Sequence, residues 1–131
     1  MEVHQENKVR RARILVADDD FQVRQRFTKR LQTVGYEAVG VASGRAALKQ
    51  LHASRFDVLV LDLDMPDLNG FEMLKKVRSE LPHVRVLVVS EYLRGALLEA
   101  ARLFGATSTL DKAKASKALI EETHRLVGDA A

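Results

Sequence analysis

The stretch Val58-Leu59-Val60-Leu61-Asp62 places one carboxylate directly after four consecutive apolar residues. A short, unbroken apolar run of this kind is typical of a strand buried on both faces, as in a parallel sheet. A turn sequence, Met65-Pro66-Asp67-Leu68-Asn69-Gly70, comes soon afterwards. Asp62 is therefore expected at the end of a central strand, which is where open α/β sheets place their ligands.

Three other polar segments also stand just after apolar runs. The acidic run Asp18-Asp19-Asp20 follows Ile14-Leu15-Val16-Ala17, Ser90 follows Val84 to Val89, and Lys112 comes soon after Thr107 to Leu110. Because the carboxyl ends of parallel strands meet at one edge of a sheet, these distant segments are expected to converge with Asp62 on one small site.

Short apolar runs alternate with amphipathic stretches along the whole chain. This alternation is typical of parallel strands joined by crossover helices, and five such units fit the sequence. Strands are expected at 14–17, 37–41, 58–62, 84–89 and 107–110. The expected helices carry apolar stripes at helical spacing, namely Val23, Phe27, Leu31 and Val34; Ala47 and Leu51; Phe71, Leu74 and Val77; Leu93, Leu97, Ala101 and Phe104; and Leu119, Ile120, Thr123 and Leu126. Gly35 and Gly105 indicate helix ends.

The length and composition bound the number of domains. A chain of 131 residues with 47% hydrophobic residues can bury one core and leaves little room for a second. We expect a flexible basic tail over residues 1–11, one domain over 12–128 and a short tail over 129–131.

Several classes of protein are disfavoured by the same composition. There is no cysteine, so a bound metal would be held by oxygen or imidazole ligands. No apolar segment is long enough for a membrane span or resembles a secretory signal, which makes a cytoplasmic location the expectation. The net charge of +3 is dispersed over the predicted helices and the N-terminal tail, and aromatic residues make up only 5%, so direct nucleic-acid binding is not expected.

The acidic run suggests a divalent cation. Adjacent carboxylates at a strand end repel one another unless a positive charge joins them, and Mg²⁺ prefers oxygen ligands such as one or two carboxylates. Asp18, Asp19 and Asp62 are therefore candidate metal ligands. Asp20 is better explained as the N-cap of the following helix.

A carboxylate held rigidly at a strand end can also act as a nucleophile. Attack of Asp62 on a phosphoryl group would give an aspartyl phosphate, and this chemistry needs groups that neutralise charge on the phosphoryl oxygens. Lys112 can supply a positive charge and Ser90 a hydroxyl donor. Each residue alone is a weak signal, since a lysine or serine after a strand is usually solvated or caps a turn.

Taken together and in this order, the segments resemble the receiver domain of two-component response regulators. The resemblance runs through residues 14–20, 62–70, 88–90 and 105–112, and covers about residues 12–127. It implies a doubly wound, flavodoxin-like α/β fold with a five-stranded parallel sheet of order 2-1-3-4-5 and five helices, as in the chemotaxis receiver. It also implies that Asp62 is the phosphorylated residue, that Ser90 and Lys112 hold the phosphoryl oxygens, and that Asp18, Asp19 and the backbone carbonyl of Asp64 bind Mg²⁺.

Some positions depart from the pattern of that family. Thr109 stands in the last strand where the family often has an aromatic switch residue. Glu91 replaces a small residue after Ser90, and its side chain either narrows the site or turns to solvent. Ala113 replaces the proline that usually follows the lysine, while Lys114 suggests an exposed loop. Tyr92 offers an alternative ring near the output face.

These features lead to the hypothesis of a stand-alone receiver, unless the chain is part of a longer regulator. It would be a signalling domain that catalyses its own aspartate phosphorylation and dephosphorylation, and not a classical enzyme. It would take its phosphoryl group from a histidine kinase or phosphotransfer protein. It would act on a protein partner through the face between the fourth and fifth helices, as a monomer or weak dimer. Two alternatives remain: a degenerate receiver that binds partners constitutively, and a haloacid-dehalogenase-type phosphatase using Asp62-Leu63-Asp64 as an Asp-x-Asp pair.

Overall fold

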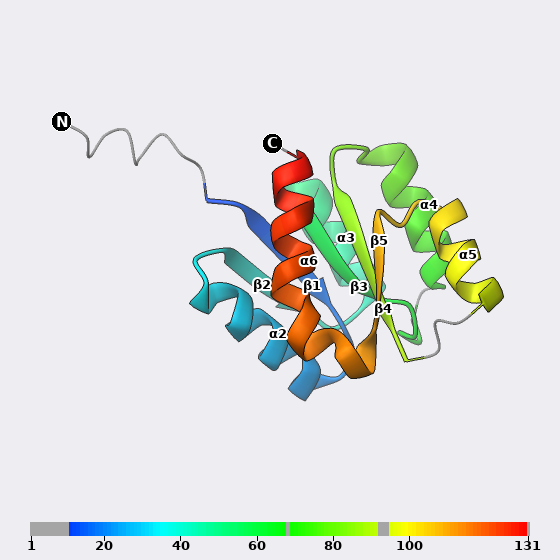
Figure 1. The fold of residues 1–131 in the computed structure, drawn as a ribbon. Helices are drawn as coiled ribbons and strands as arrows, with labels where there is room; N and C mark the ends of the chain where they lie inside the picture. The colour runs from blue at the N-terminus through cyan, green and yellow to red at the C-terminus, as the bar shows by residue number, and fades with distance from the viewer. Residues whose placement is uncertain (1–10, 68, 92–94, 131) are drawn as a thin grey trace.

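Five parallel strands form one sheet in the order β2-β1-β3-β4-β5 (Figure 1). In this computed structural model, residues 11–67, 69–91 and 95–130 are described. The strands are β1 (Arg13–Ala17), β2 (Glu37–Val41), β3 (Val58–Asp62), β4 (Arg85–Ser90) and β5 (Ser108–Asp111). The predicted fold class and strand order are confirmed. The last two strands each lie one residue further along than predicted, so Ser90 is the final residue of β4.

Five α-helices cover the two faces of the sheet in the described part of the chain. They are α2 (Phe21–Thr33), α3 (Gly44–Ala53), α4 (Gly70–Glu80), α5 (Gly95–Leu103) and α6 (Ala115–Ala130), and the short 3₁₀ turn η1 (Lys112–Lys114) precedes α6. The last helix has 16 residues and passes the expected domain end at residue 128. Residues 1–10 of the predicted basic tail lie outside the described residues.

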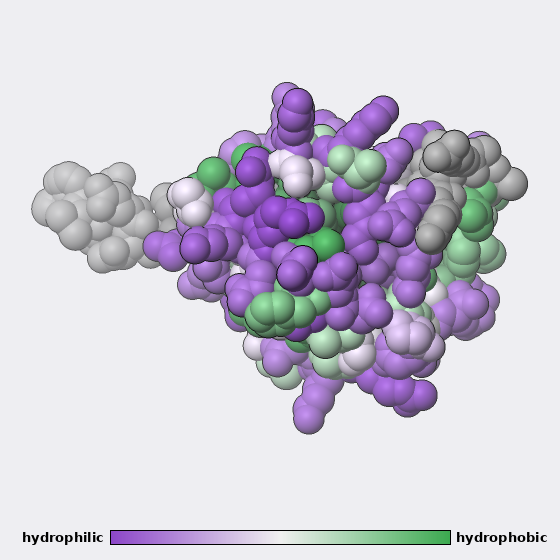
Figure 2. All heavy atoms as spheres, turned by 90° about the horizontal axis from the view of Figure 1, so that it is seen from below, coloured by the Kyte–Doolittle hydropathy of each residue, from purple (hydrophilic) through white to green (hydrophobic). Residues whose placement is uncertain are grey.

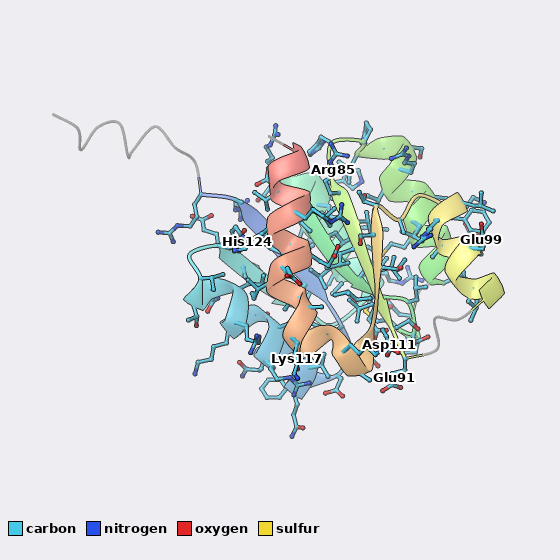
Figure 3. All side chains as sticks on the ribbon, viewed as in Figure 1. Arg85, Glu91, Glu99, Asp111, Lys117 and His124 are labelled. Atoms are coloured by element: carbon cyan, nitrogen blue, oxygen red, sulfur yellow. The ribbon has the colours of Figure 1, made fainter. Side chains whose placement is uncertain are left out.

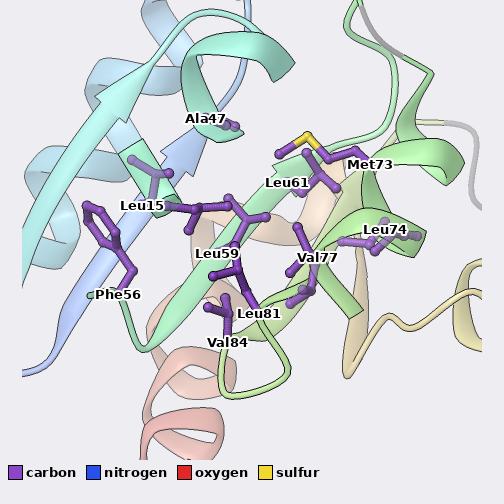
Figure 4. Packing of buried hydrophobic residues seen from close by; sticks show 14 of the residues in the cluster. Leu15, Ala47, Phe56, Leu59, Leu61, Met73, Leu74, Val77, Leu81 and Val84 are labelled. Atoms are coloured by element: carbon purple, nitrogen blue, oxygen red, sulfur yellow. The ribbon is translucent and has the colours of Figure 1, made fainter. Parts of the chain in front are cut away.

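Strand residues divide strictly between two cores because neighbouring side chains point to opposite faces of a sheet. Leu15, Leu59 and Leu61 pack with residues of α3, α4 and α5 (Figure 4). Ile14 and Val58, their neighbours in sequence, pack on the other face with residues of α2 and α6. The central strand is therefore buried on both faces, as its unbroken apolar run predicts.

The helix starts and stops follow local chemistry. Asp20 accepts hydrogen bonds from the backbone amides of Gln22 and Val23, so it is the N-cap of α2 as predicted. Asn69 caps α4 in the same way. Gly35 and Gly105, which follow α2 and α5, have φ angles of 106° and 121°, a conformation that strains other residues.

The apolar stripes are only partly buried. Ala101 on α5 is fully buried, but Leu97 and Phe104 of the same predicted stripe remain 44% and 40% exposed, as does Val34 after α2 at 45%. Val34 and Phe104 directly follow the last residues of α2 and α5, where the chain turns toward the next strand. Phe104 instead packs edge-on against Phe71, with ring centroids 5.5 Å apart. Helical spacing alone overestimates burial at these positions.

Thr123 is a predicted member of the stripe on α6, and it is fully buried. Its hydroxyl has no hydrogen-bond partner among the described residues. Thr123→Val keeps the shape and removes this unsatisfied group, so we expect the free energy of unfolding to rise by about 1 kcal/mol in urea denaturation. Thr123→Ser should be less stable than the wild type, and a destabilised valine variant would contradict the prediction.

Candidate functional site

The carboxyl ends of β1, β3, β4 and β5 meet at one edge of the sheet. This edge is the lower end of the molecule in Figure 1, and Figure 2 looks onto it, with hydrophilic residues across its centre. Asp18 follows β1, Asp62 and Ser90 are the last residues of β3 and β4, and Lys112 follows β5. The structure thus brings together the four distant segments that were expected to converge.

Asp62 is buried, with 3% of its surface exposed. One carboxylate oxygen, Oδ1, accepts a hydrogen bond of 3.0 Å from the backbone amide of Asp64. The other oxygen, Oδ2, lies 3.3 Å from the Lys112 ammonium group. Both bonds fix the direction of the carboxylate at the end of a rigid strand.

Burial raises the pKa of Asp62 to about 6. The backbone amide of Asp64 opposes this rise, the negative charge of Asp18 adds to it, and Lys112 opposes it. At neutral pH the group is therefore mostly ionised, as a nucleophile must be.

Lys112 connects two strand ends. Its Nζ atom lies 3.1 Å from Oδ2 of Asp18 and 3.3 Å from Oδ2 of Asp62. Burial opposes ionisation of Lys112, but the charges of Asp62 and Asp18 outweigh it and raise the lysine pKa above its ordinary value. The ammonium group thus stays charged at neutral pH and offsets part of the negative charge of the site.

Three carboxylates form a group that can hold a metal ion. One oxygen from each of Asp18, Asp19 and Asp62 lies within 4.8 Å of the others. Asp18 and Asp62 are buried while Asp19 is exposed, so the group opens to solvent on one side. This hard, all-oxygen donor set fits Mg²⁺ well.

Asp64 and Ser90 contact each other through their side chains. The Ser90 hydroxyl donates a hydrogen bond of 3.0 Å to Oδ2 of Asp64. The carboxylate of Asp64 therefore points to β4 and lies outside the three-carboxylate group found among the described residues. The charge of Asp64 contributes to the raised pKa of Asp62, but the Asp64 carboxylate is bonded to Ser90, so an acid and nucleophile pair of the phosphatase kind gains no support here.

Two of the positions that depart from the expected pattern, Glu91 and Ala113, lie beside this site. Glu91 is exposed and lines a groove of about 400 Å³ beside Lys112, together with Asp20, Val23, Arg26, Asp111 and Ala113. Figure 3 labels Glu91 and Asp111 at the ends of β4 and β5. The negative charge of Glu91 thus stands at the approach to the site. Thr109 is half-buried in the edge strand β5, and Tyr92 lies outside the described residues.

The turn after β5 contains a contact that the sequence analysis missed. Asp111 accepts a hydrogen bond of 2.9 Å from the backbone amide of Ala113 and so caps η1, the turn that carries Lys112. A proline at position 113 has no amide hydrogen and could not donate this bond. An aspartate placed two residues before a residue with a free backbone amide is a typical capping pattern, and this could have predicted the contact from the sequence. Lys114 is exposed, as expected.

A second missed residue, Asp67, ties down the loop after Asp62. Its carboxylate accepts bonds of 2.9 and 3.1 Å from the backbone amides of Gly44 and Arg45 at the start of α3. These bonds, that from Gly44 first, hold the pKa of Asp67 below its ordinary value. The turn composition identified the loop, but only the fold shows that it is anchored to α3.

The sequence profile of the response regulator receiver domain matches residues 14–124. The chain belongs to the response regulator receiver domain family. Receiver domains of two-component systems are signalling domains and not classical enzymes. This membership removes the basis for the phosphatase alternative.

Individual relatives agree with this assignment. The chain is 34% identical over 113 residues to the response regulator protein FleR of Pseudomonas aeruginosa, and 36% identical over 94 residues to the chemotaxis protein CheY of the same organism. These matches cover 84% and 69% of the chain, and 23% of FleR and 76% of CheY. The chain therefore spans less than a quarter of FleR.

Solved structures show the same fold. The chemotaxis protein CheY4 of Vibrio cholerae superimposes with a TM-score of 0.83 at 31% identity, covering 89% of this chain and 99% of that one. The response regulator TrrA of Thermotoga maritima, solved in complex with Mg²⁺-BeF, gives a TM-score of 0.77 at 28% identity and covers 88% and 98%.

Proposed function

We propose that this receiver is a phosphoacceptor in a two-component phosphorelay, in which Asp62 takes a phosphoryl group from a histidine kinase or phosphotransfer protein. The observation that carries this proposal is the buried Asp62 carboxylate, held between Lys112 and the carboxylates of Asp18 and Asp19. A degenerate receiver would not need this complete set of charged groups.

In the transfer step, an Asp62 oxygen attacks the phosphorus atom. A new O–P bond forms while the P–N bond to the donor histidine, or the P–O bond of acetyl phosphate, breaks, and the leaving group departs with its electron pair. The backbone amide of Asp64 holds one Asp62 oxygen, which leaves the Lys112 side of the carboxylate to face the incoming group. Lys112 then offsets negative charge on the transferred oxygens.

The carboxylates of Asp18, Asp19 and Asp62 and the backbone carbonyl of Asp64 would hold Mg²⁺ in this proposal. When bound, the ion supplies positive charge to the phosphoryl oxygens. The carboxylates of Asp18 and Asp62 are held in fixed orientations, because each accepts a hydrogen bond from the backbone amide two residues later.

Ser90 connects phosphorylation to the rest of the domain. In the structure its hydroxyl donates a hydrogen bond to the Asp64 carboxylate. A phosphoryl group adds about two negative charges and three strong acceptor oxygens, so it competes with Asp64 for this donor. Movement of Ser90 would alter β4 and the face formed by α5 and α6.

That face is the proposed contact surface for a downstream protein partner. Thr109 lies in β5, between these helices in sequence, and cannot bury and expose a ring as an aromatic residue does. Direct nucleic-acid or membrane binding forms no part of the proposal, which is of a cytoplasmic monomer or weak dimer. No helix in the described segments is long and apolar enough to cross a membrane.

Titration of the chain with beryllofluoride tests the proposal. With millimolar Mg²⁺ we expect saturable, one-to-one binding that shifts the amide resonances of residues around Asp62, Ser90 and Lys112. Binding that persists unchanged when Mg²⁺ is removed contradicts the metal assignment. No binding at all identifies a degenerate receiver.

The pKa of Asp62 predicts the pH dependence of Mg²⁺ binding. The pKa of Asp62 is raised to about 6, so this carboxylate is protonated at lower pH. The proton must then leave before Mg²⁺ can bind. The apparent dissociation constant for Mg²⁺ should rise about tenfold per pH unit below pH 6 and stay flat above pH 7. Calorimetric titrations between pH 5 and 8 measure this, and affinity independent of pH would contradict it.

A further inference from the structure

We propose that Arg24 is a positioning residue for the carboxylate site, and that Gly40 in the neighbouring strand β2 leaves the space in which the Arg24 side chain lies. The part of this inference that concerns Mg²⁺ rests on the proposed function. Arg24 lies on α2 and contacts the backbone of Asp18 and none of the three site carboxylates.

Arg24 fixes the peptide that leads from β1 into the site. Its Nη1 atom donates a hydrogen bond of 2.8 Å to the backbone carbonyl of Asp18, in a partly buried position. On the other side of the same residue, the amide of Asp18 donates a bond of 3.1 Å to the carbonyl of Val41. Asp18 lies one residue beyond the end of β1. These two bonds therefore hold its backbone in place where the hydrogen bonds between strands end.

The side chain of Asp18 depends on this backbone orientation. Its Oδ1 atom accepts a bond of 2.9 Å from the amide of Asp20, and its Oδ2 atom lies 3.1 Å from Lys112. A rotation of the Asp18 peptide would break both contacts. Arg24 therefore acts on the geometry of the site through a backbone atom.

Gly40 makes the approach of Arg24 possible. It is the fourth of the five residues of the edge strand β2, is paired with Val16, and is not among the glycines with positive φ in the described part of the chain. A Cβ atom at this position would lie 2.8 Å from Cγ and 3.2 Å from Cδ of Arg24. A glycine weakens a strand and often marks a place where another group approaches closely. The aliphatic stem of Arg24 is that group.

The guanidinium lies over an aromatic ring. Its central carbon is 5.4 Å from the centre of the Phe21 ring. The always-charged guanidinium also places positive charge behind a site that carries three carboxylates. Lysine keeps the charge but lacks the planar guanidinium that bonds to the Asp18 carbonyl while lying over the Phe21 ring.

The experiment compares Arg24→Ala, Gly40→Ala and the double variant in the full chain, with Lys29→Met as the control that removes a charge from the exposed face of α2. We expect Arg24→Ala to raise the Mg²⁺ dissociation constant about tenfold. Without metal, it should also speed hydrogen exchange at the Asp20 amide, which bonds to Asp18. Gly40→Ala should reproduce both effects, whereas in the Arg24→Ala background it should add nothing. Lys29→Met should match the wild type.

The outcomes distinguish a positioning role of Arg24 from a purely structural one. Equal Mg²⁺ affinity and equal Asp20 exchange in Arg24→Ala and the wild type overturn the inference, even if thermal stability falls, because a merely structural role predicts that pattern. Additive effects of the two substitutions overturn the assigned role of Gly40. If Arg24→Ala does not fold, Arg24→Lys serves instead and should show the same changes to a smaller extent. A wild type that binds no Mg²⁺ refutes the proposed function, while the metal-free exchange data still test Arg24.

Discussion

Asp62→Asn is expected to abolish phosphoryl labelling of the chain by acetyl phosphate or phosphoramidate. An amide nitrogen or oxygen is a far weaker nucleophile than a carboxylate, and no other described carboxylate shares the position of Asp62 between Lys112 and the Asp64 amide. The loss should exceed about a thousandfold in rate, which intact-mass spectrometry measures directly.

The matched control is Asp20→Asn. Asn caps a helix as well as Asp, and Asp20 is outside the three-carboxylate group, so labelling should remain near the wild-type rate. If Asp62→Asn is labelled in the presence of Mg²⁺ to the same extent as the wild type, Asp62 is not the phosphoryl acceptor.

Asp62→Asn should also stabilise the metal-free protein against unfolding. The pKa of Asp62 is raised from its ordinary value to about 6, so between pH 4 and 6 the folded state keeps a proton that the unfolded chain has released. Stability from this group therefore falls as pH rises through that window. At pH 7, Asp62→Asn should unfold with a free energy about 1–2 kcal/mol higher than the wild type, after allowance for solvent screening. The difference should vanish below pH 4.

Lys112→Met is expected to have the second largest effect. It removes the ammonium group that lies 3.1 Å from Asp18 and 3.3 Å from Asp62, and leaves their buried charges uncompensated. We expect labelling at pH 7 to slow about 100-fold, since an electrostatic contact to the transferred oxygens is lost. The free energy of unfolding should fall by about 1–3 kcal/mol.

The pH profile distinguishes this mechanism from general damage. Without Lys112 the pKa of Asp62 must rise further, so labelling of the variant should recover at higher pH more than that of the wild type. Lys114→Met, which removes an exposed charge two residues away, is the control and should behave as wild type. A slow variant whose pH profile matches the wild type would rule out this role of Lys112.

Local chemistry explains where sequence-based prediction succeeded and where it did not. Unbroken apolar runs located the buried strands β1, β3 and β4 within one residue, because a strand covered on both faces must be apolar throughout. Helical stripes located the helices but overestimated the burial of Leu97 and Phe104. Burial at helix ends depends on which neighbouring element covers them, and this information is not local.

The sequence by itself determined the family, the class of fold and the carboxylates, hydroxyl and lysine that converge at the strand ends, because parallel topology brings those ends to one edge. The tertiary structure alone decided how the groups are held. It shows that Ser90 bonds to Asp64, that Asp111 caps the turn carrying Lys112, and that the stem of Arg24 packs over Gly40 while its guanidinium bonds to Asp18. The physical reason is that hydrogen bonds depend on distances of a few tenths of an ångström between side chains far apart in sequence, which no spacing of residue types specifies.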